Sequence, residues 1–313
     1  MIINAGGRTD LVNYFTTWLL YRFEKGEVLS RNPFYPNIVM SYKLHPSVVD
    51  CVVMCSKNYF PILKDLHRIY DRFNIFCNYT ITAYGKDIEP NVPDIEESIN
   101  TLKLLCRQTD KEKIVWRYDP VLFTPYYTVE QHCRTFDYIS RQLSGYINYC
   151  VFSFVDLYQR VTDNIPNIII PNDDMKEMFC RKIGEIAKKN GIRIQTCATV
   201  RNYSQSGIGL SGCVTSKILT NALNVKFQDI KHSGIRKNCR CLPMRDIGAY
   251  NTCPNGCKYC YANTKPYDIK NNLQKHDPYS PLLIGTLSPD DIIKPAVQTS
   301  FLSKEKSIQK TLF

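Results

Sequence analysis

A chain of 313 residues is long enough to build one large domain or two small ones. Its hydrophobic content of 44% and charged content of 22% are ordinary for a globular enzyme, which excludes a chain that is disordered throughout. The formal net charge is +11, from 40 Lys and Arg against 29 Asp and Glu. Because these basic residues are scattered, a solvated basic surface is the first interpretation, and a nucleic-acid partner is the alternative.

The chain contains 14 cysteines, and no signal peptide precedes them. This combination favours a reducing compartment, with free or metal-bound thiols in place of disulfides. No run of about 18 apolar residues is present, so we expect no membrane-spanning helix and a cytoplasmic protein. Seven of the cysteines fall between residues 197 and 260, and the seven earlier ones are interpreted as packed core thiols.

Short apolar runs alternate with helical patterns from the first residue onward. The first strand is expected at 2–5, and Thr9 or Asp10 caps a helix that Gly26 ends. The remaining expected elements follow in pairs: strands at 50–55, 75–82, 113–118, 150–155 and 192–197, and helices through 62–69, 94–107, 128–143 and 173–190. Such alternation indicates parallel strands joined by right-handed crossovers. We therefore predict an α/β fold, a TIM-like (β/α) barrel that is complete or partial.

The composition changes after residue 198. Residues 1–198 hold the barrel units, and 199–265 form a cysteine-rich segment that completes the barrel, with one short helix near 213–223 and a strand at 246–250. Residues 266–313 are expected to form a tail that packs on the surface and frays at its end.

The segment 246–263 reads DIGAYNTCPNGCKYCYAN and places Cys253, Cys257 and Cys260 at Cys-x-x-x-Cys-x-x-Cys spacing. A Pro-Asn-Gly turn separates the first two cysteines, and Tyr259 precedes the third. Such a loop can aim three thiolates at one point, which suits a [4Fe-4S] cluster with one iron free of protein ligands. A structural zinc site or a chance spacing is the alternative.

This spacing resembles the signature of radical S-adenosylmethionine (SAM) enzymes. The resemblance implies that Cys253, Cys257 and Cys260 are catalytic, that the open iron binds SAM, and that Tyr259 lies by the adenine. It also implies cleavage of SAM to a 5′-deoxyadenosyl radical and an electron donor such as flavodoxin or ferredoxin, with the substrate undefined. Radical SAM barrels usually carry this loop after the first strand, whereas here it follows the last. We therefore hypothesise a circularly permuted barrel in which the strand at 246–250 pairs beside the strand at 2–5.

The other four cysteines between residues 197 and 260 are Cys197, Cys213, Cys239 and Cys241. They match the ligand number of a second, fully ligated Fe-S cluster or of a structural zinc ion. Ordinary buried thiols are the alternative.

Polar residues recur where the predicted strands end, which is where reactive groups sit in (β/α) barrels. Arg117, Asp119 and Asp156 are candidates for binding the cofactor: an arginine can grip the SAM carboxylate and an aspartate its ribose hydroxyls. The alternative is an Arg-Asp pair that closes the barrel rim. The candidates on the substrate side are Arg8, Asp10 and Lys57.

Longer motifs extend over nearly the whole chain: RTD at 8–10, RNP at 31–33, YGKDIEPN at 84–91, WRYDP at 116–120, SFVDLY at 153–158, the cysteine loop, and SPLLIG at 280–285. By these motifs the chain resembles the bacterial family catalogued as domain of unknown function 1848. That resemblance implies a C-terminal cysteine cluster similar to that of radical SAM enzymes. More distantly, the strand-end motifs are similar to those of spore photoproduct lyase. One departure is the pair Gly6 and Gly7, where a serine and an arginine are expected.

The sequence therefore predicts a radical SAM-like enzyme. Two alternatives remain: a zinc-binding module that recognises nucleic acid, and an Fe-S protein without SAM chemistry.

Overall fold

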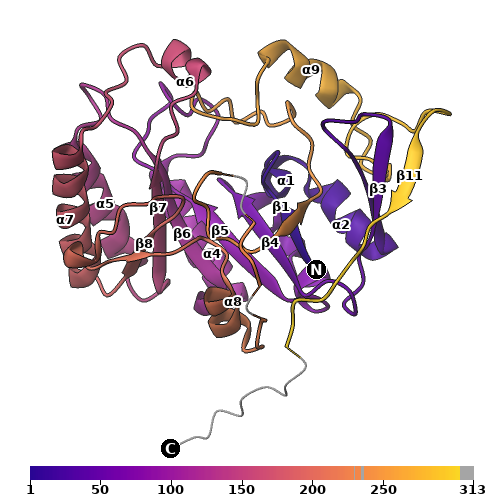
Figure 1. Cartoon of the computed structure of the whole chain (residues 1–313), viewed down its shortest axis with the longest axis horizontal. Helices are drawn as coiled ribbons and strands as arrows, with labels where there is room; N and C mark the ends of the chain where they lie inside the picture. The colour runs from indigo at the N-terminus through magenta and orange to yellow at the C-terminus, as the bar shows by residue number, and fades with distance from the viewer. Residues whose placement is uncertain (229, 234–235, 304–313) are drawn as a thin grey trace, which may run out of the picture.

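The computed structural model describes residues 1–228, 230–233 and 236–303. Its centre is a sheet of eight parallel strands in the order β10-β1-β4-β5-β6-β7-β8-β9 (Figure 1). The strands are β1 Ile2–Ala5, β4 Cys51–Ser56, β5 Ile75–Thr80, β6 Ile114–Val121, β7 Tyr149–Phe154, β8 Arg193–Thr196, β9 Ile208–Leu210 and β10 Met244–Asp246. The predicted α/β class is confirmed: the sheet alternates with helices as in a partial or open (β/α) barrel.

The helices cover the sheet and bury their apolar stripes against it. The α-helices are α1 Leu11–Tyr14, α2 Thr16–Lys25, α3 His67–Tyr70, α4 Ile95–Gln108, α5 Val129–Leu143, α6 Gln159–Asn164, α7 Asp173–Lys189, α8 Ser216–Leu223 and α9 Pro266–Gln274, and the 3₁₀ turns are η1 Phe60–Asp65, η2 Lys111–Lys113 and η3 Ser204–Ser206. Their starts follow ordinary capping chemistry: the Thr128 and Asn172 side chains accept the backbone N–H groups of the third residues in α5 and α7. None of the helices in the described part of the chain is long and apolar enough to cross a membrane.

Two predicted helices differ in detail from the structure. The Asp10 side chain caps the first helix and Gly26 ends it in the left-handed region, as predicted, but Phe15 interrupts it and divides it into α1 and α2. The helix predicted through 62–69 is mostly the 3₁₀ turn η1, followed by one turn of α3. Pro61 lies at its start and has no N–H group to donate.

A second sheet, of three strands, was not predicted. It consists of β2 Glu27–Arg31, β3 Ile38–Lys43 and β11 Ile292–Pro295, in the order β11-β3-β2 (Figure 1). The segment predicted as a surface tail therefore contributes α9 and the edge strand β11, and its last residues, 304–313, lie outside the described part.

The strand before the cysteine loop pairs with the N-terminal strand, as predicted. β10 lies parallel to β1, with Ile2 opposite Met244 and Asn4 opposite Asp246. The predicted bounds of 246–250 were wrong, because the Asp246 carboxylate accepts the Gly248 N–H at 2.9 Å and turns the chain there. Circular permutation relative to radical SAM barrels stays a hypothesis, since it depends on that resemblance.

Candidate metal centre

A cavity of about 340 Å³ lies at the carboxyl ends of the parallel strands. All seven cysteines between residues 197 and 260 contribute to its lining, and so do most of the polar residues that the sequence placed at strand ends: Asp10, Lys57, Arg117, Asp119 and Asp156. Parallel strands bring their ends to one edge of the sheet, which is why residues more than 200 positions apart meet here.

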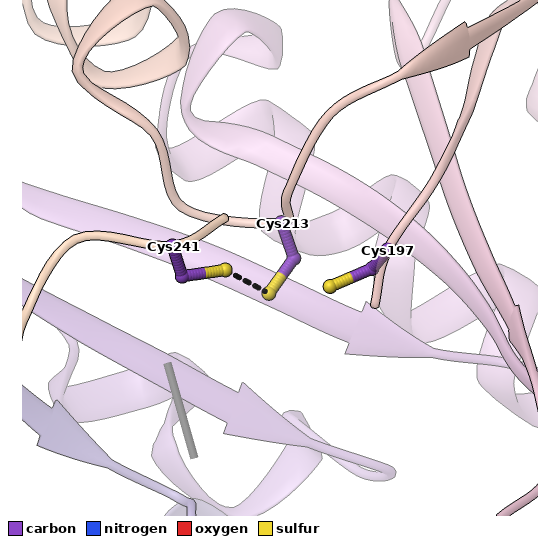
Figure 2. A group of neighbouring side chains, drawn as sticks. All are labelled: Cys197, Cys213 and Cys241. Carbon is purple, nitrogen blue, oxygen red and sulfur yellow. Dashed lines mark hydrogen bonds between the residues drawn. The ribbon is translucent and has the colours of Figure 1, made fainter. Parts of the chain in front are cut away.

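The first group of thiols is the four-thiol set, Cys197, Cys213, Cys239 and Cys241. Figure 2 shows the sulfur atoms of Cys197, Cys213 and Cys241 pointing toward one another. These three sulfurs all lie within 4.8 Å of one another, and the Cys213 and Cys241 Sγ atoms are 3.3 Å apart. Cys239 hydrogen bonds with Cys197 and Cys241. This buried cluster could hold a metal ion or an Fe-S cluster.

The thiols of the four-thiol set share hydrogen bonds, and their pKa values move in opposite directions. Hydrogen bonds from Cys213, Cys239 and Cys241 lower the pKa of Cys197. The contact with Cys197 raises the pKa of Cys241. One thiolate is therefore stabilised by three neighbouring S–H groups, an arrangement that a cation can replace by binding to all four sulfurs.

The second group is the loop triad, Cys253, Cys257 and Cys260. It is not gathered as tightly: among the described residues, the sulfurs that all lie within 4.8 Å of one another are those of Cys197, Cys213 and Cys241. Burial raises the pKa of Cys253 to about 12 and also raises that of Cys257. The loop turns at Gly256, whose φ of +70° lies in the left-handed region.

The backbone of the loop is held by side chains from other elements. The Asn255 amide donates to Asp10 Oδ2 at 3.2 Å and accepts the Tyr14 hydroxyl at 2.9 Å. The Asn91 side chain donates to the Pro254 carbonyl at 2.8 Å. These contacts fix the loop without any contribution from its sulfur atoms.

Glu89 is a site residue that sequence reasoning missed, although it lies within the motif at 84–91. Its buried carboxylate accepts hydrogen bonds from Lys57 at 2.8 Å, from Thr82 at 2.7 Å and from the Tyr259 hydroxyl. Burial lowers the pKa of Lys57, but Glu89 and Cys257 more than offset this effect and the pKa lies above its usual range. Glu89 thus joins the cysteine loop to the ends of two strands.

The rim of the cavity holds the predicted cofactor-binding residues. Arg117 forms an ion pair with Asp119, whose carboxylate also accepts the Ser153 hydroxyl. Asp156 pairs with Arg236 at 2.6 Å. Arg236 was not predicted as a site residue, since it lies in an irregular segment with no strand end to mark it. Asp10 and Lys57 line the cavity, whereas Arg8 is not part of its lining and packs over the Tyr250 ring.

Fold and site together define a parallel α/β protein with a cysteine-lined cavity at the strand ends. The chain belongs to the family described as Domain of unknown function (DUF1848), whose model matches residues 2–262. The match ends just after the loop triad. No curated protein and no solved structure matches the chain, so the resemblance to radical SAM enzymes and to spore photoproduct lyase stays a hypothesis.

Proposed function

We propose that the protein is a radical SAM-type enzyme in which Cys253, Cys257 and Cys260 hold a [4Fe-4S] cluster beside a SAM-binding cavity. The observation that carries this proposal is that the three thiols line one cavity together with Tyr259 and the charged strand ends. Thiols that line a cavity and whose sulfurs stand apart from one another fit a cluster in which each thiolate binds a different iron. When bound, the cluster and SAM would supply a 5′-deoxyadenosyl radical that abstracts hydrogen from a substrate.

The residues around the loop triad have separate tasks in this proposal. Arg117 lines the cavity, so its guanidinium can donate to the carboxylate of SAM. Asp119 and Asp156 supply acceptors for ribose hydroxyls. Tyr259 is fixed through its hydroxyl by Glu89, which orients its ring for the adenine.

Substrate contacts are proposed for the part of the cavity near the β1 and β4 ends. Asp10 and Lys57 lie there. Because hydrogen bonds from Ser56, from the Lys57 N–H and from Asn255 engage Asp10, its role is to position the loop as well as to line the cavity. The electron for the cluster would come from a donor such as flavodoxin or ferredoxin.

The test is anaerobic reconstitution with iron and sulfide, followed by reduction in the presence of SAM and measurement of 5′-deoxyadenosine. We expect about four irons on the loop triad and formation of 5′-deoxyadenosine. Cys257→Ser should abolish both, and the matched control Cys180→Ser, a buried thiol of α7, should keep both. Brown protein that leaves SAM intact would instead identify an Fe-S protein without SAM chemistry.

A second measurement tests the proposed role of Arg117 in binding SAM. Replacing Arg117 by Lys removes the forked donor but keeps the positive charge opposite Asp119. The dissociation constant for SAM should rise roughly tenfold or more, as expected for the loss of one charge-assisted hydrogen bond. An unchanged affinity would remove Arg117 from the SAM site.

A further inference from the structure

The eight-stranded sheet is open, and its two edge strands are β9 and β10. The four-thiol set lies in the segments next to these edges. Cys197 directly follows β8, Cys213 follows β9, and Cys239 and Cys241 precede β10. The sulfur contacts therefore bring the chain leaving one edge of the sheet against the chain entering the other edge.

We propose that Cys197, Cys213, Cys239 and Cys241 bind a single Zn²⁺ ion, and that this ion joins the two edges of the open sheet. None of the proposed zinc ligands belongs to the loop triad, and zinc binding does not require SAM.

Distances among three of the sulfur atoms favour one ion over an Fe-S cluster, and the fourth, from Cys239, hydrogen bonds with two of them, Cys197 and Cys241. Four thiolates at about 2.3 Å from a tetrahedral Zn²⁺ stand about 3.8 Å from one another. The Cys213 and Cys241 sulfurs are 3.3 Å apart, and those of Cys197, Cys213 and Cys241 all lie within 4.8 Å. In a [4Fe-4S] cluster each thiolate binds a different iron at a separate corner, so the sulfurs stand farther apart than around one ion.

Charges near the site complement a zinc tetrathiolate, which carries a net charge of −2. Arg117 interacts electrostatically with Cys213 and Cys197, and Arg236 interacts with Cys197. The backbone N–H of Val214 donates to Cys241 Sγ at 3.4 Å, which is a common outer contact of metal-bound thiolates. Two guanidinium groups thus stand where the excess negative charge of the complex would develop.

The backbone allows the segment that contains Cys213 to lie close to the segment that contains Cys241. A Cβ atom at Gly212 would lie 3.1 Å from Cys241 Sγ, so a larger residue would crowd the two segments apart. The Leu242 N–H donates to the Val214 carbonyl at 2.8 Å and joins the same segments through their backbones. The close approach of two irregular segments places the Cys213 and Cys241 thiols in contact.

The test uses the full chain with Cys253, Cys257 and Cys260 all replaced by Ser, which removes the loop triad and keeps the four-thiol set. Elemental analysis of this variant, purified without added metal, should give about one zinc per chain and no iron. Replacing its zinc by Co²⁺ should produce the ligand-field spectrum of a tetrahedral tetrathiolate complex.

A matched variant, Cys213→Ser with the loop triad intact, should lose the zinc but still bind iron after reconstitution. If this variant does not fold, titration of the folded triple variant with a mercurial thiol reagent provides the second measurement, and zinc should be released as the four thiols react. Iron and sulfide retained by the triple variant in place of zinc, or a folded triple variant that binds no metal, would overturn the proposal. Neither result bears on 5′-deoxyadenosine formation by the loop triad.

Discussion

The loop triad and the four-thiol set line the same cavity, but they are held in different ways. Asparagine side chains and the Glu89 network hold the loop triad from outside, and its sulfurs stay apart. In the four-thiol set the sulfurs themselves are in contact with one another across two irregular segments. The loop triad is therefore held by contacts that do not involve its sulfurs, whereas in the four-thiol set the proposed ion would replace the shared protons.

This difference suits two kinds of metal site. A reactive centre benefits from ligands that keep their positions while cofactor and substrate come and go. A structural ion, in contrast, contributes its binding free energy to folding. The predictions below test this division of roles, beginning with the largest expected effect.

The largest expected effect is the loss of folding free energy when a chelator removes zinc from the variant in which Cys253, Cys257 and Cys260 are replaced by Ser. An ion present at a thousand times its dissociation constant stabilises the fold by about 4 kcal/mol, and that amount should disappear. Hydrogen exchange should accelerate in residues 211–228 and 236–243, while the loop at 251–263 keeps its protection. Equal loss of protection in both segments would show that the two thiol groups are held in the same way.

Glu89→Ala should be nearly as costly, because it leaves the Lys57 ammonium group buried without a partner. Lys57 is 11% exposed and Glu89 is 3% exposed. Breaking such a pair destabilises a protein by about 3–5 kcal/mol, which denaturant unfolding can measure. The control is Glu130→Ala, which removes an exposed pair with Lys182 and should cost about 1 kcal/mol or less. A loss of this small size for Glu89→Ala would mean that the Asn255 and Asn91 contacts suffice to hold the loop.

The central sheet could be predicted from the sequence because its signal is local. Apolar runs that alternate with helical patterns marked β1 and β4 to β8, and the order of the parts led to the pairing of β10 with β1. The three-stranded sheet could not be predicted in this way. β11 is exposed at all four positions, and its partner β3 lies about 250 residues earlier, so neither periodicity nor proximity in the sequence marks it.

In the candidate site, too, the residues with a local sequence signal could be predicted and the others could not. Cysteine spacing and strand-end position singled out cysteines and charged residues that line one cavity, and their roles as ligands stay a prediction. Glu89 and Arg236 could not be found, because each acts through contacts with residues distant in the sequence: Glu89 with Lys57 and Tyr259, and Arg236 with Asp156. The separation between sulfurs, which distinguishes one ion from a cluster, depends on the paths of irregular segments and has no signal in residue spacing.

Gly7→Ala tests the edge of the sheet that leads to the loop triad. A Cβ atom there would lie 2.3 Å from Asp246 Oδ2 and 2.6 Å from Asn4 Nδ2, so both side chains would have to move and the Asp246 carboxylate would lose its hydrogen bond from the Gly7 N–H. Overpacking of this kind costs about 1–3 kcal/mol in denaturant unfolding. Gly209→Ala is the matched control in β9 at the other edge, since its nearest neighbour is Gln195 Cβ at 3.4 Å, and it should change stability by about 0.5 kcal/mol or less. Equal costs at the two edges would contradict this account of the β1 and β10 contact.

Arg236→Ala should have the smallest effect on stability. It tests directly whether side-chain contacts or the proposed ion hold the four-thiol set in place. The Arg236 side chain joins the segment of the four-thiol set to the rim, through Asp156 at 2.6 Å, Ser153 at 2.7 Å and the Phe154 carbonyl at 3.1 Å. Because Arg236 is 26% exposed and Asp156 is 44% exposed, water screens the pair and its loss should cost about 1 kcal/mol in denaturant unfolding.

The control for this variant is Arg201→Ala, which removes exposed pairs with Asp173 and Glu177 on α7 and should leave the free energy of unfolding nearly unchanged. Zinc content should stay at about one ion per chain in both variants, because the sulfur ligands remain in place. If Arg236→Ala costs as much as Glu89→Ala, side chains hold the four-thiol segment as they hold the loop. In that case the ion is not the principal link between the two edges of the sheet.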